Sequence, residues 1–262
     1  MPDPRTDRTT LTSTQYGNGA NLVARASIYR WQRPPFDLVS WVLDQHEWQG
    51  NEGVLDVGCG YGAYLHGLRR RAETVVGVDL SAGMLREVAT RGAPLVCGDG
   101  QQLPLRDATF DVAIAPHMLY HLPDVRLGIA ELRRVVRAGG VVLAVTNAVD
   151  DKPEIRRLLH RAADRPLGSY AKVDNRFTLE DAPSLLGEAF DHLRVVDVCT
   201  EIAVPEVEPV IRYVDSIRSA AEPALRVDWQ QLLSRAASMA QSEIDAVGAF
   251  RITTHAGVVV AQ

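Results

Sequence analysis

The chain has 262 residues, of which 46% are hydrophobic and 23% are charged. These proportions are typical of a globular protein, and the length allows one large domain or one domain with a smaller cap. A formal net charge of -5 excludes the broad basic surface that general nucleic-acid binding requires. The three cysteines, Cys59, Cys97 and Cys199, are too few and too scattered for a disulfide framework or a zinc site. We therefore expect a cytoplasmic protein without a bound metal.

The N-terminal fifty residues precede the first predicted strand. Residues 1–14 are polar, and no apolar run approaches the roughly 20 residues of a membrane span. We expect a flexible tail over residues 1–14, followed by lid helices over residues 15–50. Helical spacing of apolar residues predicts these helices over residues 21–29 and 36–46.

The segment 51–150 alternates short β-branched runs with helical stretches, which is typical of buried parallel strands and crossover helices. We therefore predict a doubly wound, Rossmann-like, mostly parallel α/β sheet, with ligands at the carboxyl ends of its strands. The predicted strands are 53–57, 74–79, 94–97, 110–115 and 140–146, and the predicted helices are 61–71, 81–91 and 127–136.

The last segment, residues 151–262, is dominated by helical patterns. We expect it to supply substrate-pocket helices and the strands that complete the sheet, including an antiparallel edge strand. Helices are predicted over residues 153–163, 179–189, 206–220 and 228–247, and strands over 193–204 and 257–261. His255 is expected in a hairpin turn outside the site.

A glycine-rich turn follows the first core strand. In the stretch Val54 to Gly62, three glycines alternate with other residues, so the backbone can pass close under a ligand. The glycine pattern alone is weak evidence for any one ligand, because Gly58, Gly60 and Ala63 also satisfy the G-x-G-x-x-G/A form of dinucleotide-binding proteins.

Acidic residues at three strand ends help to decide between a dinucleotide and S-adenosylmethionine as the ligand of this turn. Asp56 would lie near the anionic pyrophosphate of a dinucleotide, whereas S-adenosylmethionine offers a cationic ammonium and sulfonium. Asp79 ends the second core strand, where a carboxylate can accept hydrogen bonds from ribose hydroxyls. Asp99 follows the third strand and can accept from an adenine amino group. An ordinary cap or turn position is the alternative for each of these aspartates.

Four segments together carry a family resemblance. They are VLDVGCGYGAY (54–64), VVGVDLSAGML (75–85), GDGQQLPLRDATFDVAIAPHMLYHLPD (98–124) and ELRRVVRAGGVVLAVT (131–146). In order and spacing they resemble the motifs of class I S-adenosylmethionine-dependent methyltransferases. Within that class they look like the small-molecule branch of ubiquinone/menaquinone-biosynthesis and natural-product enzymes.

The resemblance implies a set of cofactor-binding residues. It assigns Asp56, Gly58, Cys59 and Gly60 to the methionyl part, Asp79 to the ribose, Leu80 and Met84 to the adenine face, and Asp99, Gly100 and Gln101 to the adenine edge. It further implies that Pro116 offers its carbonyl to the methionyl ammonium, and that Tyr16, Arg25 and Tyr29 of the lid are candidates for the methionyl carboxylate. For the last three, a solvated arginine and packing tyrosines are the alternatives.

The fourth core strand is followed by His117, Tyr120 and His121, where a methyl acceptor must approach. We take these three as candidate catalytic residues, because histidine readily accepts a proton near neutral pH. A packing role is the alternative for His121. A base is needed only if the acceptor must lose a proton before methyl transfer, as a hydroxyl group does.

The expected function is transfer of a methyl group from S-adenosylmethionine to an O or N atom of a small metabolite, with S-adenosylhomocysteine as product. The expected partner is a small-molecule acceptor, with no nucleic acid and no membrane, and the expected assembly is a monomer or homodimer. A non-catalytic sensor or scaffold that binds the cofactor is the main alternative. Protein methyl transfer and NAD-dependent oxidoreduction are weaker ones.

Overall fold

The computed structural model describes residues 3–88, 92–166 and 176–262. These residues form one mixed sheet of eight strands in the order β1-β7-β8-β6-β5-β2-β3-β4. The strands are β1 (Gln32–Arg33), β2 (Gly53–Val57), β3 (Thr74–Asp79), β4 (Leu95–Cys97), β5 (Phe110–Pro116), β6 (Val136–Asn147), β7 (Leu193–Val204) and β8 (Phe250–Ala261). The strands β2 to β6 run parallel, and β8, β7 and β1 add antiparallel pairs. The predicted Rossmann-like α/β fold is confirmed.

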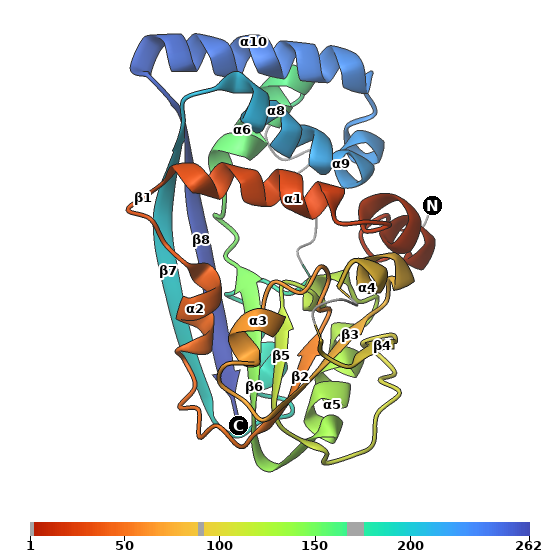
Figure 1. Ribbon diagram of the computed structural model, residues 1–262. Coiled ribbons are helices and arrows are strands. Elements are labelled where there is room, and N and C mark those ends of the chain that lie inside the picture. Colours follow the sequence, from red (N-terminus) through yellow and green to blue (C-terminus); the bar gives the residue numbers. More distant parts are fainter. Residues whose placement is uncertain (1–2, 89–91, 167–175) are drawn as a thin grey trace.

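The helices form a lower group around the sheet and an upper group beyond the carboxyl ends of the parallel strands (Figure 1). The lower helices are α2 (Leu38–Leu43), α3 (Leu65–Leu68), α4 (Ala82–Val88), η4 (Leu119–His121), α5 (Val125–Val135) and α7 (Ala182–Leu186). The upper helices are η1 (Thr10–Gln15), α1 (Ala20–Ser27), η2 (Ile28–Trp31), α6 (Pro153–Ala163), α8 (Val207–Ser216), α9 (Arg218–Leu225) and α10 (Trp229–Val247). No helix in the described ranges is long and apolar enough to cross a membrane.

Three buried apolar clusters hold these layers together. One cluster joins α5 and α7 to one face of the sheet, and a second joins α2 and α3 to the other face. Neighbouring residues of β2 show the alternation, since Val54 belongs to the second cluster and Leu55 to the first. The third cluster lies in the upper layer, where α6, α8 and α10 pack on the ends of β7 and β8. We call α6, α8, α9 and α10 the cap.

The cap rests on the part of β7 and β8 that runs past the end of β6. β6 pairs with β8 only as far as Asn147↔Ala256, whereas β7 and β8 stay paired up to Val204↔Phe250. Figure 1 shows this two-stranded extension rising from the sheet to the cap. The apolar side chains of Ile202 and Ile252 on the extension are fully buried. The extension therefore holds the cap above the carboxyl ends of the parallel strands.

Several predicted elements differ from the structure. β8 begins at Phe250, so His255 lies inside a strand rather than in a hairpin turn. The helix predicted over residues 61–71 is reduced to α3, because the glycine loop continues as turns before it. The helix predicted over residues 206–220 ends at Ser216, where Ile217 leaves helical geometry, and α9 follows. The predicted helix end at residues 89–91 lies outside the described residues.

Residues 3–16 contact the rest of the protein, whereas the sequence predicts a flexible tail over residues 1–14. Leu11 is buried, and the carbonyl of Arg5 is 3.0 Å from Nδ1 of His121. Ser81 Oγ donates to the carbonyl of Tyr16 at 2.7 Å, which ties η1 to the start of α4. Sequence polarity did not reveal this docking, because it depends on polar contacts with distant residues.

We expect Leu132→Ala to lower the free energy of unfolding by about 2–5 kcal/mol, because it opens a cavity under α5. Leu132 is 1% exposed, whereas Leu127 on the same helix is 52% exposed. The matched variant Leu127→Ala should therefore change stability by less than about 0.5 kcal/mol. Denaturant unfolding of both variants measures the difference, and equal losses would contradict the assigned face of α5.

Candidate active site

A cavity of about 460 Å³ lies where the parallel strands end, under α1 and the cap. Its lining comes from the loops after β2, β3, β4 and β5, from the N-terminal segment, and from β7, β8 and α8. Every candidate site residue from the sequence lines it except Gln101. The Gln101 side chain instead accepts a hydrogen bond from the backbone N–H of Asp124 at 2.8 Å. The prediction that Gln101 contacts the cofactor is therefore not supported by its position.

The glycine loop forms the floor of this cavity. Gly58 and Gly60 have φ angles of 72° and 53°, a region that side chains rarely allow. A Cβ atom on Gly58 would lie 2.7 Å from Cβ of Met118. The backbone N–H groups of Gly58 and Cys59 both donate to the carbonyl of Val78, at 2.7 and 3.0 Å. The loop is thereby fixed against the end of β3.

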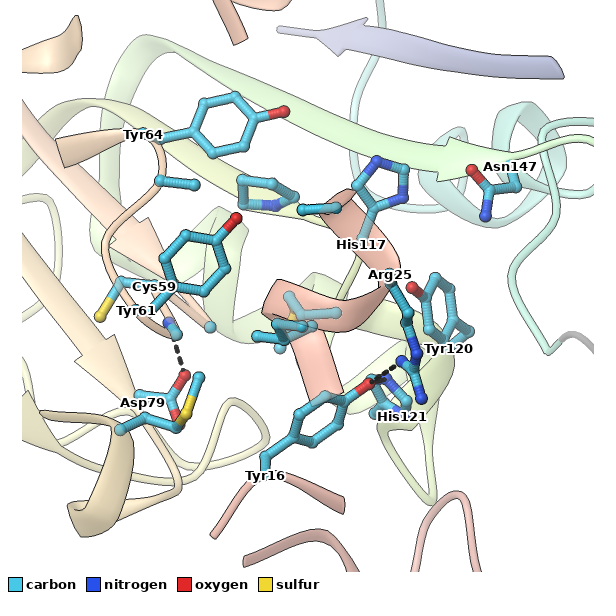
Figure 2. A pocket seen from close by; sticks show the side chains of 18 of the residues that line it. Tyr16, Arg25, Cys59, Tyr61, Tyr64, Asp79, His117, Tyr120, His121 and Asn147 are labelled. Carbon is cyan, nitrogen blue, oxygen red and sulfur yellow. Dashed lines mark hydrogen bonds between the residues drawn. The ribbon is translucent and has the colours of Figure 1, made fainter. Parts of the chain in front are cut away.

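Asp79 lies at that end of β3 and holds two backbone N–H groups. Its Oδ2 accepts from Gly60 at 2.8 Å, drawn in Figure 2, and its Oδ1 accepts from Ser81 at 2.8 Å. Burial raises the pKa of Asp79 above its ordinary value, although both hydrogen bonds oppose this shift. Each oxygen keeps a further lone pair for a ligand hydroxyl.

Asp56 is the least satisfied group of the cavity. It is 1% exposed, and neither carboxylate oxygen has a hydrogen-bond partner among the described residues. Burial, with a contribution from the charge of Asp79, raises the pKa of Asp56 to about 8. A buried carboxylate without partners is costly, so its presence here favours a ligand that brings a donor or a positive charge.

The remaining residues of this end of the cavity come from β4 and α4. Asp99 accepts from the backbone N–H of Gln101 at 2.9 Å and also lines the cavity. Leu80 and Met84 supply an apolar wall next to Asp79. This wall and the two carboxylates give the mixed apolar and acceptor surface that an adenosine group requires.

A hydrogen-bonded chain closes the cavity on the side of the N-terminal segment (Figure 2). Nδ1 of His121 faces the carbonyl of Arg5 at 3.0 Å, so this nitrogen carries the proton. Nε2 therefore accepts from the Tyr16 hydroxyl at 2.9 Å, and that hydroxyl accepts from Arg25 Nη1 at 3.3 Å. Burial lowers the pKa of His121 to about 4, which keeps the ring neutral at pH 7.

Arg25 is a half-buried cation whose described partners are all uncharged. Its Nε and Nη2 donate to the side chain and carbonyl of Ser216 on α8, at 3.1 and 2.7 Å. Although burial opposes the charge, the neighbouring Tyr16 and Tyr213 oxygens raise the pKa of Arg25. No described carboxylate pairs with it, so the guanidinium can accept an anionic ligand group. Arg25 also links α1 to the cap.

The cavity is also lined by His117, Tyr120, Tyr29 and Lys152. No described group is hydrogen-bonded to the ring of His117, whose φ angle of 54° is unusual for a residue with a side chain. Burial, followed by the charge of Lys152, lowers the pKa of His117 to about 4. His117 is therefore a neutral imidazole with a free acceptor nitrogen.

Sequence reasoning missed Lys152 and Tyr213. Lys152 Nζ donates to Asp151 at 2.7 Å and lies 5.7 Å from the centre of the Tyr29 ring. Although burial opposes its charge, Tyr29 and Asp151 raise the pKa of Lys152 well above its ordinary value. Burial raises the pKa of Tyr213 to about 12. The position of Lys152 just beyond a strand end was a usable signal, whereas Tyr213 on α8 gave none.

The strand order, the glycine loop and the carboxylates at consecutive strand ends define a Rossmann-like fold of the class I methyltransferase type. Residues 55–144 match the family model described as "Methyltransferase domain". This segment is therefore similar to a methyltransferase domain, as the sequence motifs predict.

One curated relative and two solved structures illustrate what this chain is similar to. A demethylmenaquinone methyltransferase of Corynebacterium kroppenstedtii is 42% identical over 122 residues, which are 47% of this chain and 53% of that protein. The chain thus matches about half the length of this curated relative. A structure of Haemonchus contortus phosphoethanolamine N-methyltransferase 2 with S-adenosyl-L-methionine has a TM-score of 0.62 and 17% sequence identity. The match covers 97% of this chain and 59% of that protein. The structure of the [4+2]-cyclase SpnF has a TM-score of 0.53 and 17% sequence identity, and the match covers 86% of this chain and 80% of that protein.

We expect Asp56→Asn to stabilise the ligand-free protein, and more so at pH 8 than at pH 5. The unfolded carboxyl ionises near its ordinary pKa of 3.8, while the folded one ionises at about 8. Between these values folding requires proton uptake, so the cost of the buried group grows with pH up to about 8. Asparagine removes this cost. Thermal unfolding at both pH values measures the gain.

The exposed Asp191 provides the control. Asp191→Asn should leave the unfolding midpoint nearly unchanged at pH 5 and pH 8. A gain for Asp56→Asn that is equal at both pH values would argue against an uncompensated carboxyl at this position.

Proposed function

We propose that this protein transfers a methyl group from S-adenosylmethionine to an O or N atom of a small metabolite, in natural-product or quinone-type biosynthesis. One observation carries the proposal: a buried carboxyl group, Asp56, and a half-buried guanidinium, Arg25, line the same cavity, and no described group of opposite charge pairs with either. A zwitterionic ligand group satisfies both, and the methionyl end of S-adenosylmethionine carries an ammonium and a carboxylate.

The described residues fit the rest of this cofactor. Asp79 would accept from the ribose hydroxyls, Leu80 and Met84 would cover the adenine, and Asp99 with Gly100 would meet its edge. Gly58, Cys59, Gly60 and the carbonyl of Pro116 would surround the methionyl part, and Tyr29 would close the lid side. Tyr16 and His121 would act mainly by positioning Arg25, because their polar atoms are already engaged with each other.

When bound, S-adenosylmethionine supplies an electrophilic methyl group for in-line displacement. The protein's part is to align the acceptor and to exclude water. His117 can take the proton of a hydroxyl acceptor through its free ring nitrogen. Tyr120 and Lys152 also line the cavity and can hold the acceptor oxygen.

The fold alone does not fix this chemistry, since a [4+2]-cyclase shares it. A pyrophosphate-containing cofactor is disfavoured, because Asp56 would face its negative charge. We further propose, as the sequence suggests, a cytoplasmic monomer or homodimer. Its residues 15–50 would form the lid, residues 51–150 the cofactor core, and residues 151–262 the acceptor side.

Isothermal titration with S-adenosylhomocysteine tests cofactor binding. We expect saturable binding by the wild type, a loss of about tenfold or more in Asp79→Ala, and unchanged binding in Asp191→Asn. NAD should give no heat. Binding of NAD in place of S-adenosylhomocysteine would overturn the proposal in favour of redox chemistry, and cofactor binding without methyl transfer to any acceptor would favour a sensor or scaffold.

We expect His117→Asn to keep the affinity for S-adenosylhomocysteine within about twofold and to lower the rate of methyl transfer to a hydroxyl acceptor by about 10²–10⁴-fold. The reason is that the variant keeps the shape of the cavity but loses the proton-accepting nitrogen. Single-turnover rates with an acceptor found by screening measure the effect. An unchanged rate would indicate an acceptor that needs no base, such as an amine.

A further inference from the structure

The β7–β8 pair carries a polar cluster on the face that points away from the cavity. Thr200 and Thr254 line the cavity, so the side chains of Cys199 and His255 lie on the other face of the same strands. Cys199 and His255 are direct partners in the register of β7 and β8. Asp197 lies two residues before Cys199 and shares its face.

These three side chains bring together nitrogen, sulfur and oxygen donors. Their ligand atoms all lie within 4.8 Å of one another. Nε2 of His255 is 2.9 Å from Asp197 Oδ2, while Nδ1 is 2.6 Å from Asp150 Oδ1. The orientation of the His255 ring is therefore fixed, with Nδ1 bonded to Asp150 and Nε2 directed at Asp197.

The surrounding charge is negative. The carboxylates of Asp150, Asp197 and Asp151 all lie close to the Cys199 thiol. Lys152 is the nearby cation, and its ammonium is already engaged with Asp151. A divalent cation would relieve this concentration of carboxylates and would favour the thiolate form of Cys199.

We propose that Asp197, Cys199 and His255 form a binding site for a zinc-type divalent cation. Imidazole, thiolate and carboxylate are the ligands that zinc prefers, and a water molecule would complete a tetrahedral set. Asp150 would act as the carboxylate that orients a metal-bound histidine by accepting its Nδ1–H. On binding, the thiol of Cys199 and Nε2 of His255, which otherwise faces the Asp197 carboxylate, each give a proton to solvent.

The site requires only small side-chain movements. Metal–ligand distances of about 2.0–2.3 Å place tetrahedral ligand atoms roughly 3.3–3.8 Å apart, and the donors already lie within 4.8 Å. The backbone N–H of His255 donates to Asp151 Oδ1 at 3.0 Å, and Asp151 also holds Lys152. A bound metal would therefore stiffen the cavity wall formed by Thr200, Thr254 and Lys152.

Titration of the chelator-treated, untagged protein with Co²⁺ tests the site. We expect one Co²⁺ per chain, a near-ultraviolet sulfur-to-cobalt charge-transfer band, tetrahedral visible bands, loss of both on adding Zn²⁺, and a higher unfolding midpoint with Zn²⁺. Cys199→Ser should lose the charge-transfer band. Cys97→Ser, which alters another exposed cysteine, should keep it.

Substitutions of the other proposed metal ligands, and of the carboxylate that orients His255, test the site independently. Asp197→Asn and His255→Gln should weaken Co²⁺ binding by at least about tenfold, and Asp150→Asn by about 10–100-fold. A wild-type protein without the charge-transfer band, or a band that persists in Cys199→Ser, would overturn the proposal. In that case the cluster is a histidine bridging two aspartates, and Zn²⁺ would leave the unfolding midpoint unchanged.

Discussion

The carbonyl of Val78 accepts two backbone hydrogen bonds from the glycine loop, and the position of the cavity depends on this contact. It joins the end of β2 to the end of β3, while Asp79 holds Gly60 from the side. With Gly58 and Gly60 at positive φ, the loop turns sharply enough to leave open space above the strand ends. Because parallel strands end at one edge, the loops after β4 and β5 are brought to the same space.

The polar groups around that space are organised for a ligand rather than for the stability of the empty protein. Asp56 has no partner, and Arg25 has only uncharged ones. Both arrangements cost stability in the absence of a ligand. Such local costs are typical of functional sites, where binding energy offsets them. The chain of Arg5, His121, Tyr16 and Arg25 further connects the N-terminal segment to the binding site.

Part of the cavity lining comes from segments of the chain that lie outside the matched domain. Residues 55–144 match the family, whereas Lys152, Tyr213 and Thr254 come from later segments. The extension of β7 and β8 brings them over the cavity by holding the cap above the sheet. Among the similar solved structures, a phosphoethanolamine N-methyltransferase and a [4+2]-cyclase share this fold, so the fold does not by itself determine the reaction.

The sequence by itself determined the parallel core and the cofactor end of the cavity, because both follow from local order along the chain. A buried strand, a glycine turn and a terminal acid are each contiguous, so the positions of Asp56, Asp79 and Asp99 at the strand ends were predictable. Docking of the N-terminal residues, the roles of Arg25 and His121, and the length of β8 were decided by tertiary structure. Each depends on contacts between distant residues, such as Arg25 with Ser216 and Cys199 with His255. Spacing along the chain carries no signal for such contacts, because strand pairing and cap packing bring the partners together only in the folded protein.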